Sequence, residues 1–146
     1  LPLWANSVTD NANLAGNNNG TANFTFYMAC FGGGELNSVW RATTGVNKVC
    51  GSNLGVITLN TWIHIAFVRD GNTNRQYVNG VQSGTVSVTG LTADTNSSPL
   101  YVGAIGSALT SPLFPGYIDD FRFTKGICRY PSGTTFTPPT AAFPNK

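Results

Sequence analysis

Charged residues are scarce in this sequence: Lys, Arg, Asp and Glu together make up only 10% of its 146 residues, against about a quarter in an average domain. No apolar stretch approaches the roughly 20 residues that a membrane-spanning helix needs. The basic residues are scattered and the net charge is +2, so no basic cluster suits a phosphate backbone. These absences predict neither membrane insertion nor nucleic-acid binding.

Cysteine and histidine are also few, and this limits metal and redox chemistry. The three cysteines, Cys30, Cys50 and Cys128, have neither zinc-site nor C-x-x-C spacing. Their odd number leaves at least one thiol unpaired, and one disulfide or three free thiols both fit. His64 is the single histidine, so several histidines of one chain cannot share a metal. It alternates with two isoleucines, and we expect a strand histidine that is hydrogen-bonded across the sheet.

What the sequence does contain is short β-branched and aromatic runs, separated by Asn, Gly, Ser and Thr. No segment has apolar residues at helical spacing over three turns, whereas runs that recur every 8 to 12 residues or so are typical of a sandwich. Residues 1–23 are rich in Asn and Gly and predict a loop with one short strand around Trp4. Further strands are predicted at residues 24–31, 38–43, 54–59, 62–68, 76–78, 86–88, 100–103 and 116–123.

The clearest local structure is a meander over residues 61–82. Trp62 opens a buried-strand run and is therefore expected in the core. Asp70 and Gly71 form a turn signal after this run. Asn79-Gly80 lies between two alternating runs and predicts a tight hairpin, because both turn positions need a positive φ.

Two ordered motifs resemble a known family. The run TWIHIAFVRDGNTNRQYVNGVQ resembles the W-x-H-x-A-x-x-x-D-G…Y-V-N/D-G-V signature of laminin-G-like, concanavalin A-like domains. LYVGAIG, followed by GYIDDFRFTKGICRY, resembles the ending of the same domains. The closing FTPPTAAFP is similar to the form common in bacteriophage structural proteins. The resemblance implies an all-β, antiparallel jelly-roll sandwich, in which residues 62–81 stack face to face with the strand through Ile118 and Phe121.

The pattern divides the chain into an Asn/Gly-rich segment at residues 1–22, a sandwich at 23–130 and a Pro-rich extended tail at 131–146. The prolines exclude a central strand or a helix from the tail, which should lie along the domain surface. The first strand of the family is either Phe24–Tyr27 or a segment upstream of Leu1. We prefer the second reading, which leaves a sheet position open for a partner. Since the chain starts at Leu1 without Met, we expect it to be a piece of a longer polypeptide.

The acidic residues do not predict an enzyme. Glycosidases of this superfold need two carboxylates that flank the scissile bond, and the sequence has no E-x-D-x-x-E cluster. Asp119 and Asp120 are adjacent, so on a strand they point to opposite faces. One of them should be buried against Arg69, Arg122 or turn amides. The alternative for this pair is calcium, which some laminin-G-like domains bind at a rim.

Sugar binding needs an exposed aromatic face that is flanked by amides and hydroxyls. Trp40 and Arg41, with Asn37 and Asn47 near them, are the best candidates. Together with the resemblance, these features predict a non-enzymatic virion structural or adhesion module in a virion or extracellular setting. Such a module would assemble with other structural subunits or a second copy of itself, or attach to host-surface glycans. The alternative is a carbohydrate-binding module of a secreted or cell-surface protein.

Overall fold

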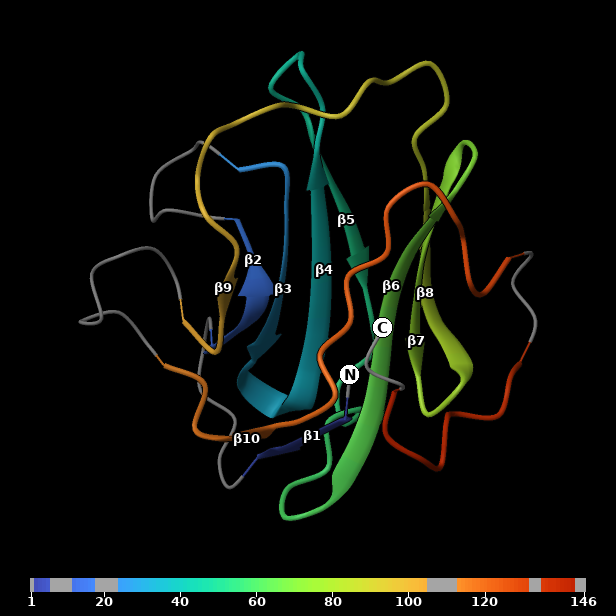
Figure 1. Ribbon diagram of the computed structural model, residues 1–146. Coiled ribbons are helices and arrows are strands. Elements are labelled where there is room, and N and C mark those ends of the chain that lie inside the picture. The colour runs from blue at the N-terminus through green and yellow to red at the C-terminus, as the bar shows by residue number, and fades with distance from the viewer. Residues whose placement is uncertain (1, 6–11, 18–23, 105–112, 132–134, 144–146) are drawn as a thin grey trace.

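The computed structural model of the chain describes residues 2–5, 12–17, 24–104, 113–131 and 135–143. It is an all-β sandwich of two five-stranded antiparallel sheets that lie face to face (Figure 1). The predicted fold class is therefore confirmed. Within the described residues there is no helix long and apolar enough to cross a membrane.

One sheet, here the β6 sheet, has the strand order β10-β1-β6-β7-β8. Its strands are β1 (Pro2–Ala5), β6 (Trp62–Asp70), β7 (Thr73–Val78), β8 (Val81–Ser87) and β10 (Gly116–Ile118). The predicted meander forms its centre, with Ile65 opposite Val78 and Asp70 opposite Thr73. Asn79 and Gly80 take φ values of 49° and 80°, which confirms the predicted hairpin turn.

The other sheet, here the β4 sheet, has the order β5-β4-β3-β2-β9. Its strands are β2 (Ala12–Gly16), β3 (Phe26–Phe31), β4 (Glu35–Arg41), β5 (Asn47–Gly51) and β9 (Tyr101–Val102). A short 3-10 turn, η1 (Gly32–Gly34), connects β3 to β4. These three consecutive glycines make the turn that follows β3.

The core lies between the sheets, where alternate residues of each strand face inward. Leu14 and Leu36 of the β4 sheet pack with Ile63 and Ile65 of the β6 sheet, and all four are buried. At one side the sheets also come close together, because a Cβ on Gly84 of β8 would lie 2.5 Å from the carbonyl oxygen of Gly51 on β5. Only glycine permits that approach.

A polar bridge crosses the same side of the interior. The Ser38 hydroxyl donates to Gln76 Oε1 at 2.6 Å, and Gln76 Nε2 donates to the Leu36 carbonyl at 3.0 Å and to Ser83 Oγ at 3.1 Å. Ser38 and Gln76 are fully buried, so these bonds satisfy groups that water cannot reach. The bridge therefore fixes the position of β4 relative to β7.

The N-terminal segment differs from its prediction. The short strand around Trp4 is confirmed as β1, but Ala12–Gly16, expected in a loop, is the strand β2. β2 lies between β3 and β9 in the β4 sheet. The expected first strand upstream of Leu1, and the open sheet position that it would leave, stay predictions. The division of the chain at residues 22/23 and 130/131 stays a prediction.

Other strand predictions were also wrong. Residues 54–59 form turns instead of a strand, and the strand β5 just before them was missed. The late strand ends at Ile118 instead of residue 123, and it lies in the same sheet as β6, separated from it by β1. Face-to-face stacking of these two stretches was therefore wrong, although Ile118 and Phe121 do pack against the shared core.

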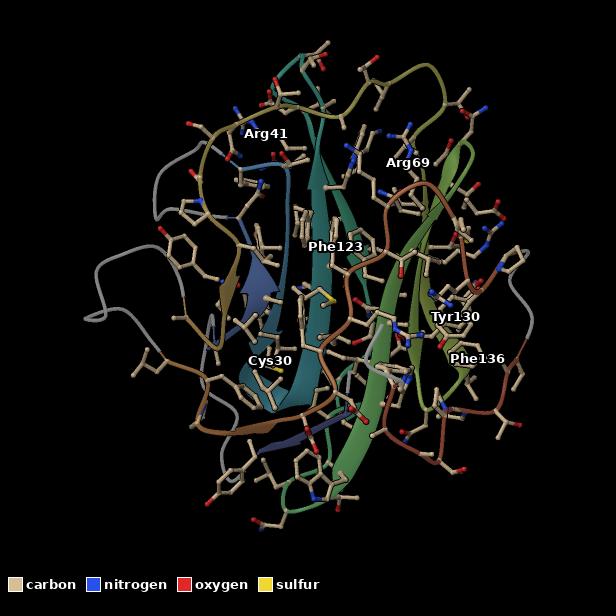
Figure 2. All side chains as sticks on the ribbon, viewed as in Figure 1. Cys30, Arg41, Arg69, Phe123, Tyr130 and Phe136 are labelled. Atoms are coloured by element: carbon tan, nitrogen blue, oxygen red, sulfur yellow. The ribbon has the colours of Figure 1, made fainter. Side chains whose placement is uncertain are left out.

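The described part of the Pro-rich tail has neither strand nor helix, as predicted. It is attached to the hairpin, since the Phe136 N–H donates to the Gly80 carbonyl at 2.9 Å. The Phe136 ring stacks on Tyr130, with centroids 3.7 Å apart. Figure 2 shows both rings beside the β7–β8 hairpin.

Candidate functional site

A cavity of about 730 Å³ lies between the two sheets, below residues 121–130. These residues follow β10 and run across the front of β4 and β6 in Figure 1. Inner side chains of β3 and β4 form one wall, β6 forms another and residues 121–130 form the roof. Its volume lies in the range of small-molecule sites, about 300–1,000 Å³. The cavity is thus built by elements that are far apart in the sequence.

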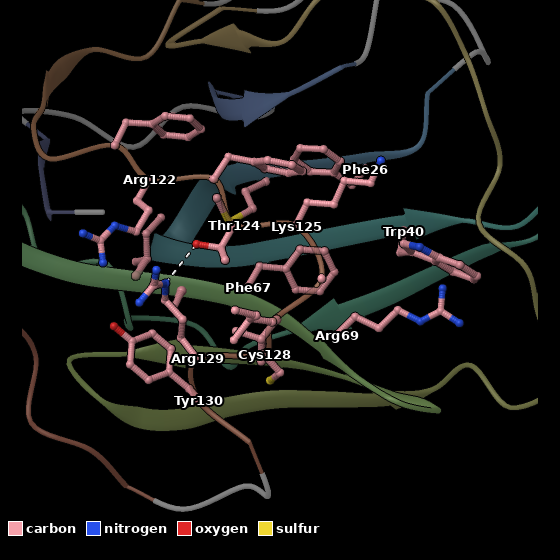
Figure 3. A pocket seen from close by; sticks show the side chains of 18 of the residues that line it. Phe26, Trp40, Phe67, Arg69, Arg122, Thr124, Lys125, Cys128, Arg129 and Tyr130 are labelled. Atoms are coloured by element: carbon pink, nitrogen blue, oxygen red, sulfur yellow. Dashed lines mark hydrogen bonds between the residues drawn. The ribbon is translucent and has the colours of Figure 1, made fainter. Parts of the chain in front are cut away.

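Aromatic side chains dominate the walls (Figure 3). Phe26 of β3 stacks with Phe123 of the roof, with centroids 5.6 Å apart and ring planes inclined by 20°. Phe123 is nevertheless 60% exposed, so part of its surface remains open to solvent. Phe67 of β6 and Trp40 of β4 lie deeper in the interior, and Phe143 of the tail also lines the cavity.

Four cations accompany these rings: Arg69, Arg122, Lys125 and Arg129. The Arg69 guanidinium lies 4.8 Å from the centre of the Trp40 ring, and that of Arg122 lies 3.6 Å from the centre of Phe143. Such cation–π contacts stabilise a guanidinium without neutralising it. Arg129 Nε donates to the Thr124 hydroxyl at 2.9 Å, the dashed contact in Figure 3.

The residues that line the cavity include no carboxylate. The ion pairs found among the described residues lie elsewhere: Arg41 with Asp94 at 3.1 Å and Arg75 with Asp70 at 3.0 Å. Each uses a cation that is not part of the lining. The cavity therefore combines aromatic surface with positive charge that no acidic side chain of the described chain balances.

His64 of β6 borders the cavity and is 8% exposed. Its ring makes T-shaped contacts with the rings of Tyr130 and Phe136, with centroids 6.3 and 5.8 Å apart. Burial lowers the pKa of His64 to about 4, so the imidazole is neutral at pH 7. The cross-sheet bonds are made by its backbone, which exchanges hydrogen bonds with Asn79. The expected side-chain bond is absent from the described residues, where Nδ1 is buried without a partner.

The predicted sugar-binding set is divided between the two faces of the β4 sheet, with Asn47 on β5 and the other three residues on β4. Trp40 is only 5% exposed and points into the interior, so the exposed aromatic face that we predicted there was wrong. Its neighbour Arg41 points to the opposite face, because successive strand residues alternate. There Arg41 donates to Asn47 Oδ1 at 3.3 Å as well as to Asp94. Trp40 alone of this set lines the cavity.

Asn37 lies on the same face of the β4 sheet as Arg41, opposite Gly51 of β5. Its Oδ1 is buried and has no hydrogen-bond partner among the described residues. Ligand binding by Asn37, Arg41 and Asn47 stays a prediction.

The Asp119–Asp120 pair is not arranged as predicted. Because β10 ends at Ile118, strand alternation does not continue, and Asp120 instead takes a left-handed φ of 48°. Asp119 is exposed and Asp120 half-buried, so the prediction of a buried carboxylate was wrong. Asp119 Oδ1 accepts a hydrogen bond from the Asp120 N–H at 2.8 Å. A turn amide was one of the partners that we expected for this pair.

The described residues offer few side-chain ligands for a calcium ion at Asp119 and Asp120. Calcium takes about 6–8 oxygen ligands, and no group of three or more His, Cys, Asp or Glu side chains occurs among the described residues. The two carboxylates do not by themselves fit such a site. Calcium binding by Asp119 and Asp120 stays a prediction that calcium titration would check.

The residues predicted to be structural have mixed outcomes. Asp70 ends β6 at the turn and pairs with Arg75, and the Asn79–Gly80 turn is as predicted. Trp62, expected in the core, is 52% exposed, because it begins β6 on the face away from the buried Ile63 and Ile65.

The cysteines are free thiols, which settles the alternatives left open by the sequence. Cys30 and Cys50 are buried in the β4 sheet, and burial raises their pKa values to about 12 and 11. Cys128 is half-buried and lines the cavity.

Most of the cavity was missed by sequence reasoning. The one available signal was the run of residues 122–129, in which three of eight residues are cations and none is acidic. The Lys and Arg residues looked scattered because Arg69 is far in the sequence from the three cations of residues 122–129. It lines the same cavity only in the folded chain.

A family model described as the concanavalin A-like lectin/glucanases superfamily matches residues 3–127 of the chain. The match includes the first motif and all but the last three residues of the second, and it confirms the resemblance to concanavalin A-like domains. It also includes residues ahead of Asn23. The bacteriophage form of the domain stays a prediction. No curated protein and no solved structure matches the chain.

Proposed function

Because the chain belongs to the concanavalin A-like lectin/glucanases superfamily, we propose that it is a non-enzymatic module that binds a carbohydrate in the cavity below residues 121–130. The observation that carries the proposal is the lining: aromatic rings beside guanidinium and hydroxyl donors. An aromatic ring can pack against the C–H face of a sugar, while fixed donors select its hydroxyl oxygens. Phe123 offers exposed ring surface, and Thr124 and Arg129 lie close to it in the roof.

The lack of carboxylates in this lining supports binding without hydrolysis. Retaining and inverting glycosidases place two carboxyl groups about 5–9.5 Å apart on either side of the scissile bond. The lining residues supply neither an acid nor a nucleophile of that kind. A sugar held in this cavity would therefore be bound and released unchanged.

A glycan array tests the proposal, followed by titration of the strongest glycan against the variant Phe123→Ala. We expect this variant to bind about tenfold more weakly, which corresponds to the loss of about 1.4 kcal/mol of contact between the sugar and the ring. Tyr117→Ala is the matched control, since Tyr117 is similarly exposed at 66% but does not line the cavity. No binding to any glycan, or equal losses in the two variants, would contradict the proposed site.

Within this function we propose that the chain serves as a virion attachment module, located in a virion or in the extracellular space. The closing FTPPTAAFP run, similar to bacteriophage structural proteins, and the low charge content of 10% support this finer proposal. Assembly with further copies or with other structural subunits belongs to it. Light scattering gives the oligomeric state, and adsorption to bacterial cells with and without competing free glycan measures attachment. A monomer that binds glycans but never adsorbs to cells would favour a secreted or cell-surface binding module instead.

A further inference from the structure

We propose that the carbohydrate bound in this cavity is acidic: a sugar that carries an oxyanion, either a carboxylate or a sulfate ester. The inference rests on the proposed function and deepens it, because it names the chemical class of the ligand. Four of the eight Lys and Arg residues of the chain line this one cavity, whereas none of its acidic residues does so in the described structure. A chain with so few charges thus concentrates one sign in one place.

The partners described for Arg69 and Arg129 are carbonyl, hydroxyl and aromatic groups, which carry no charge and do not neutralise the guanidinium. Arg69 donates from Nε to the Gly71 carbonyl at 3.2 Å and from Nη2 to the Leu91 carbonyl at 3.1 Å, and it lies over Trp40. A guanidinium has five N–H donors, so further donors remain for a ligand. Among the described residues, Arg129 donates from Nε to a neutral hydroxyl, that of Thr124.

None of these four cations forms an ion pair with a carboxylate among the described residues. The described ion pairs use Arg41 and Arg75, which lie outside the cavity. Cations that gather around an apolar space repel one another, and the low dielectric of the walls strengthens their field. An anion that enters would relieve this repulsion and gain charge-assisted hydrogen bonds, which are about twice as strong as neutral ones.

The arrangement suits an acidic sugar better than a bare inorganic anion. Figure 3 shows Arg69 with Trp40 at one end of the view and Arg122 with Arg129 at the other, while Phe26 and Phe67 lie between them. Rings between cations offer stacking for a sugar ring and planar guanidinium forks for its carboxylate or sulfate. Both anions share this recognition chemistry, so the experiment must separate them.

The experiment compares a neutral and an acidic polymer of similar backbone on the full chain by isothermal titration. Dextran against dextran sulfate tests the sulfate, and an oligogalacturonate against its methyl ester tests the carboxylate. We expect at least one acidic partner to bind about tenfold more tightly than its neutral counterpart, and this preference to shrink as salt rises from low to high ionic strength. The arm with the larger preference identifies the anion.

Lys125→Gln and Lys48→Gln provide a matched pair of variants. Both remove one positive charge, but Lys125 lines the cavity and Lys48 lies on β5 outside it. Weaker acidic-glycan binding by Lys125→Gln alone would support the inference. Equal weakening by both would overturn it, because the attraction would then come from net charge. Tight binding of neutral glycans with no acidic preference would also overturn it while leaving the proposed function intact. If no glycan of either kind binds, the proposed function itself fails.

Discussion

His64 is a buried neutral base that contacts aromatic rings on the face of β6 away from Ile63 and Ile65. The rings of Tyr130 and Phe136 stand perpendicular to its own, at 87° and 85°. Nδ1 is buried, and no hydrogen-bond partner for it occurs among the described residues. A proton added there would bring a charge into a site with no compensating group, which explains the direction of the shift to a pKa of about 4.

The depressed pKa of His64 predicts that stability falls as the pH is lowered from about 6.5 to about 4. In that window the unfolded chain binds a proton on the imidazole and the folded chain does not, so acid favours unfolding. Above pH 6.5 the imidazole is neutral in both states and contributes nothing to the slope. The full loss is on the order of 3 kcal/mol. Urea unfolding followed at several pH values measures it.

Carboxylates also titrate near pH 4, so the histidine is isolated by comparing the wild type with His64→Leu. The difference in unfolding free energy between the two should be constant above pH 6.5. It should then move in favour of the variant by about 3 kcal/mol as the pH drops to 4. A difference that stays constant over the whole range would show that the imidazole titrates alike in the folded and unfolded chain.

At the scale of elements, the β7–β8 turn is also the attachment point of the tail. Gly80 has a φ of 80°, and a Cβ there would collide with the carbonyl oxygen of Phe136. Gly80→Ala should therefore cost about 3 kcal/mol, from left-handed strain together with displacement of the tail. Chemical denaturation gives the change.

Gly90 provides the control for this substitution. Its φ of 71° is similar, but a Cβ there would meet nothing within 4 Å. Gly90→Ala should cost only the backbone strain, about 1 kcal/mol. Equal costs at the two positions would mean that the tail does not rest on Gly80 in solution.

The strands that could be predicted from the sequence are those with aromatic or β-branched alternation, such as β3 and β6. β2 was missed because Ala12–Gly16 contains only one large apolar residue, Leu14, and because all five residues are buried, so no alternation marks the strand. Residues 54–59 carry four aliphatic side chains and looked like a strand. Gly55, with a φ of 78°, and Asn60, with 55°, make turns there instead. Local pattern therefore failed where burial on both faces or backbone turns decided the outcome.

The candidate cavity could not be predicted in the same way. Its walls join Phe26, Trp40, Phe67 and Phe123, which lie on separate segments and meet only through the sheet order. Trp40 was selected from the sequence for its neighbours on the chain, Arg41 and Asn37. Strand alternation places it on the other face, with a different set of partners. The residue was thus placed in a site, but not in the one we predicted.

In the molecule as a whole, the two sides of the interior differ. Near β5 and β8 the sheets approach closely and are joined by the polar bridge through Gln76. Below residues 121–130 they leave the cavity. A rigid bridge on one side holds the sheets at a fixed separation, so the cavity can persist on the other side without being filled by side chains.

The polar bridge should behave as one coupled unit in a double-mutant cycle. Gln76→Leu leaves the Ser38 hydroxyl without its acceptor and removes one of the two hydrogen bonds to the Leu36 carbonyl, which keeps the Ser52 N–H as a donor. We expect a loss of about 3 kcal/mol. Ser38→Ala leaves Gln76 Oε1 without its donor and should cost about 1–2 kcal/mol. The double variant should lose less than the sum by about 1 kcal/mol, because the second change removes a group that the first had already left unpaired. Urea unfolding of all four proteins measures the coupling.

Ser38→Ala combined with Thr89→Ala is the control cycle, since Thr89 is exposed and does not belong to the bridge. These two changes should add within about 0.5 kcal/mol. If the Ser38–Gln76 pair were equally additive, the two side chains would not share a hydrogen bond in solution. The sheets would then be held at their separation by apolar packing alone, and the cavity would have lost the support argued for it.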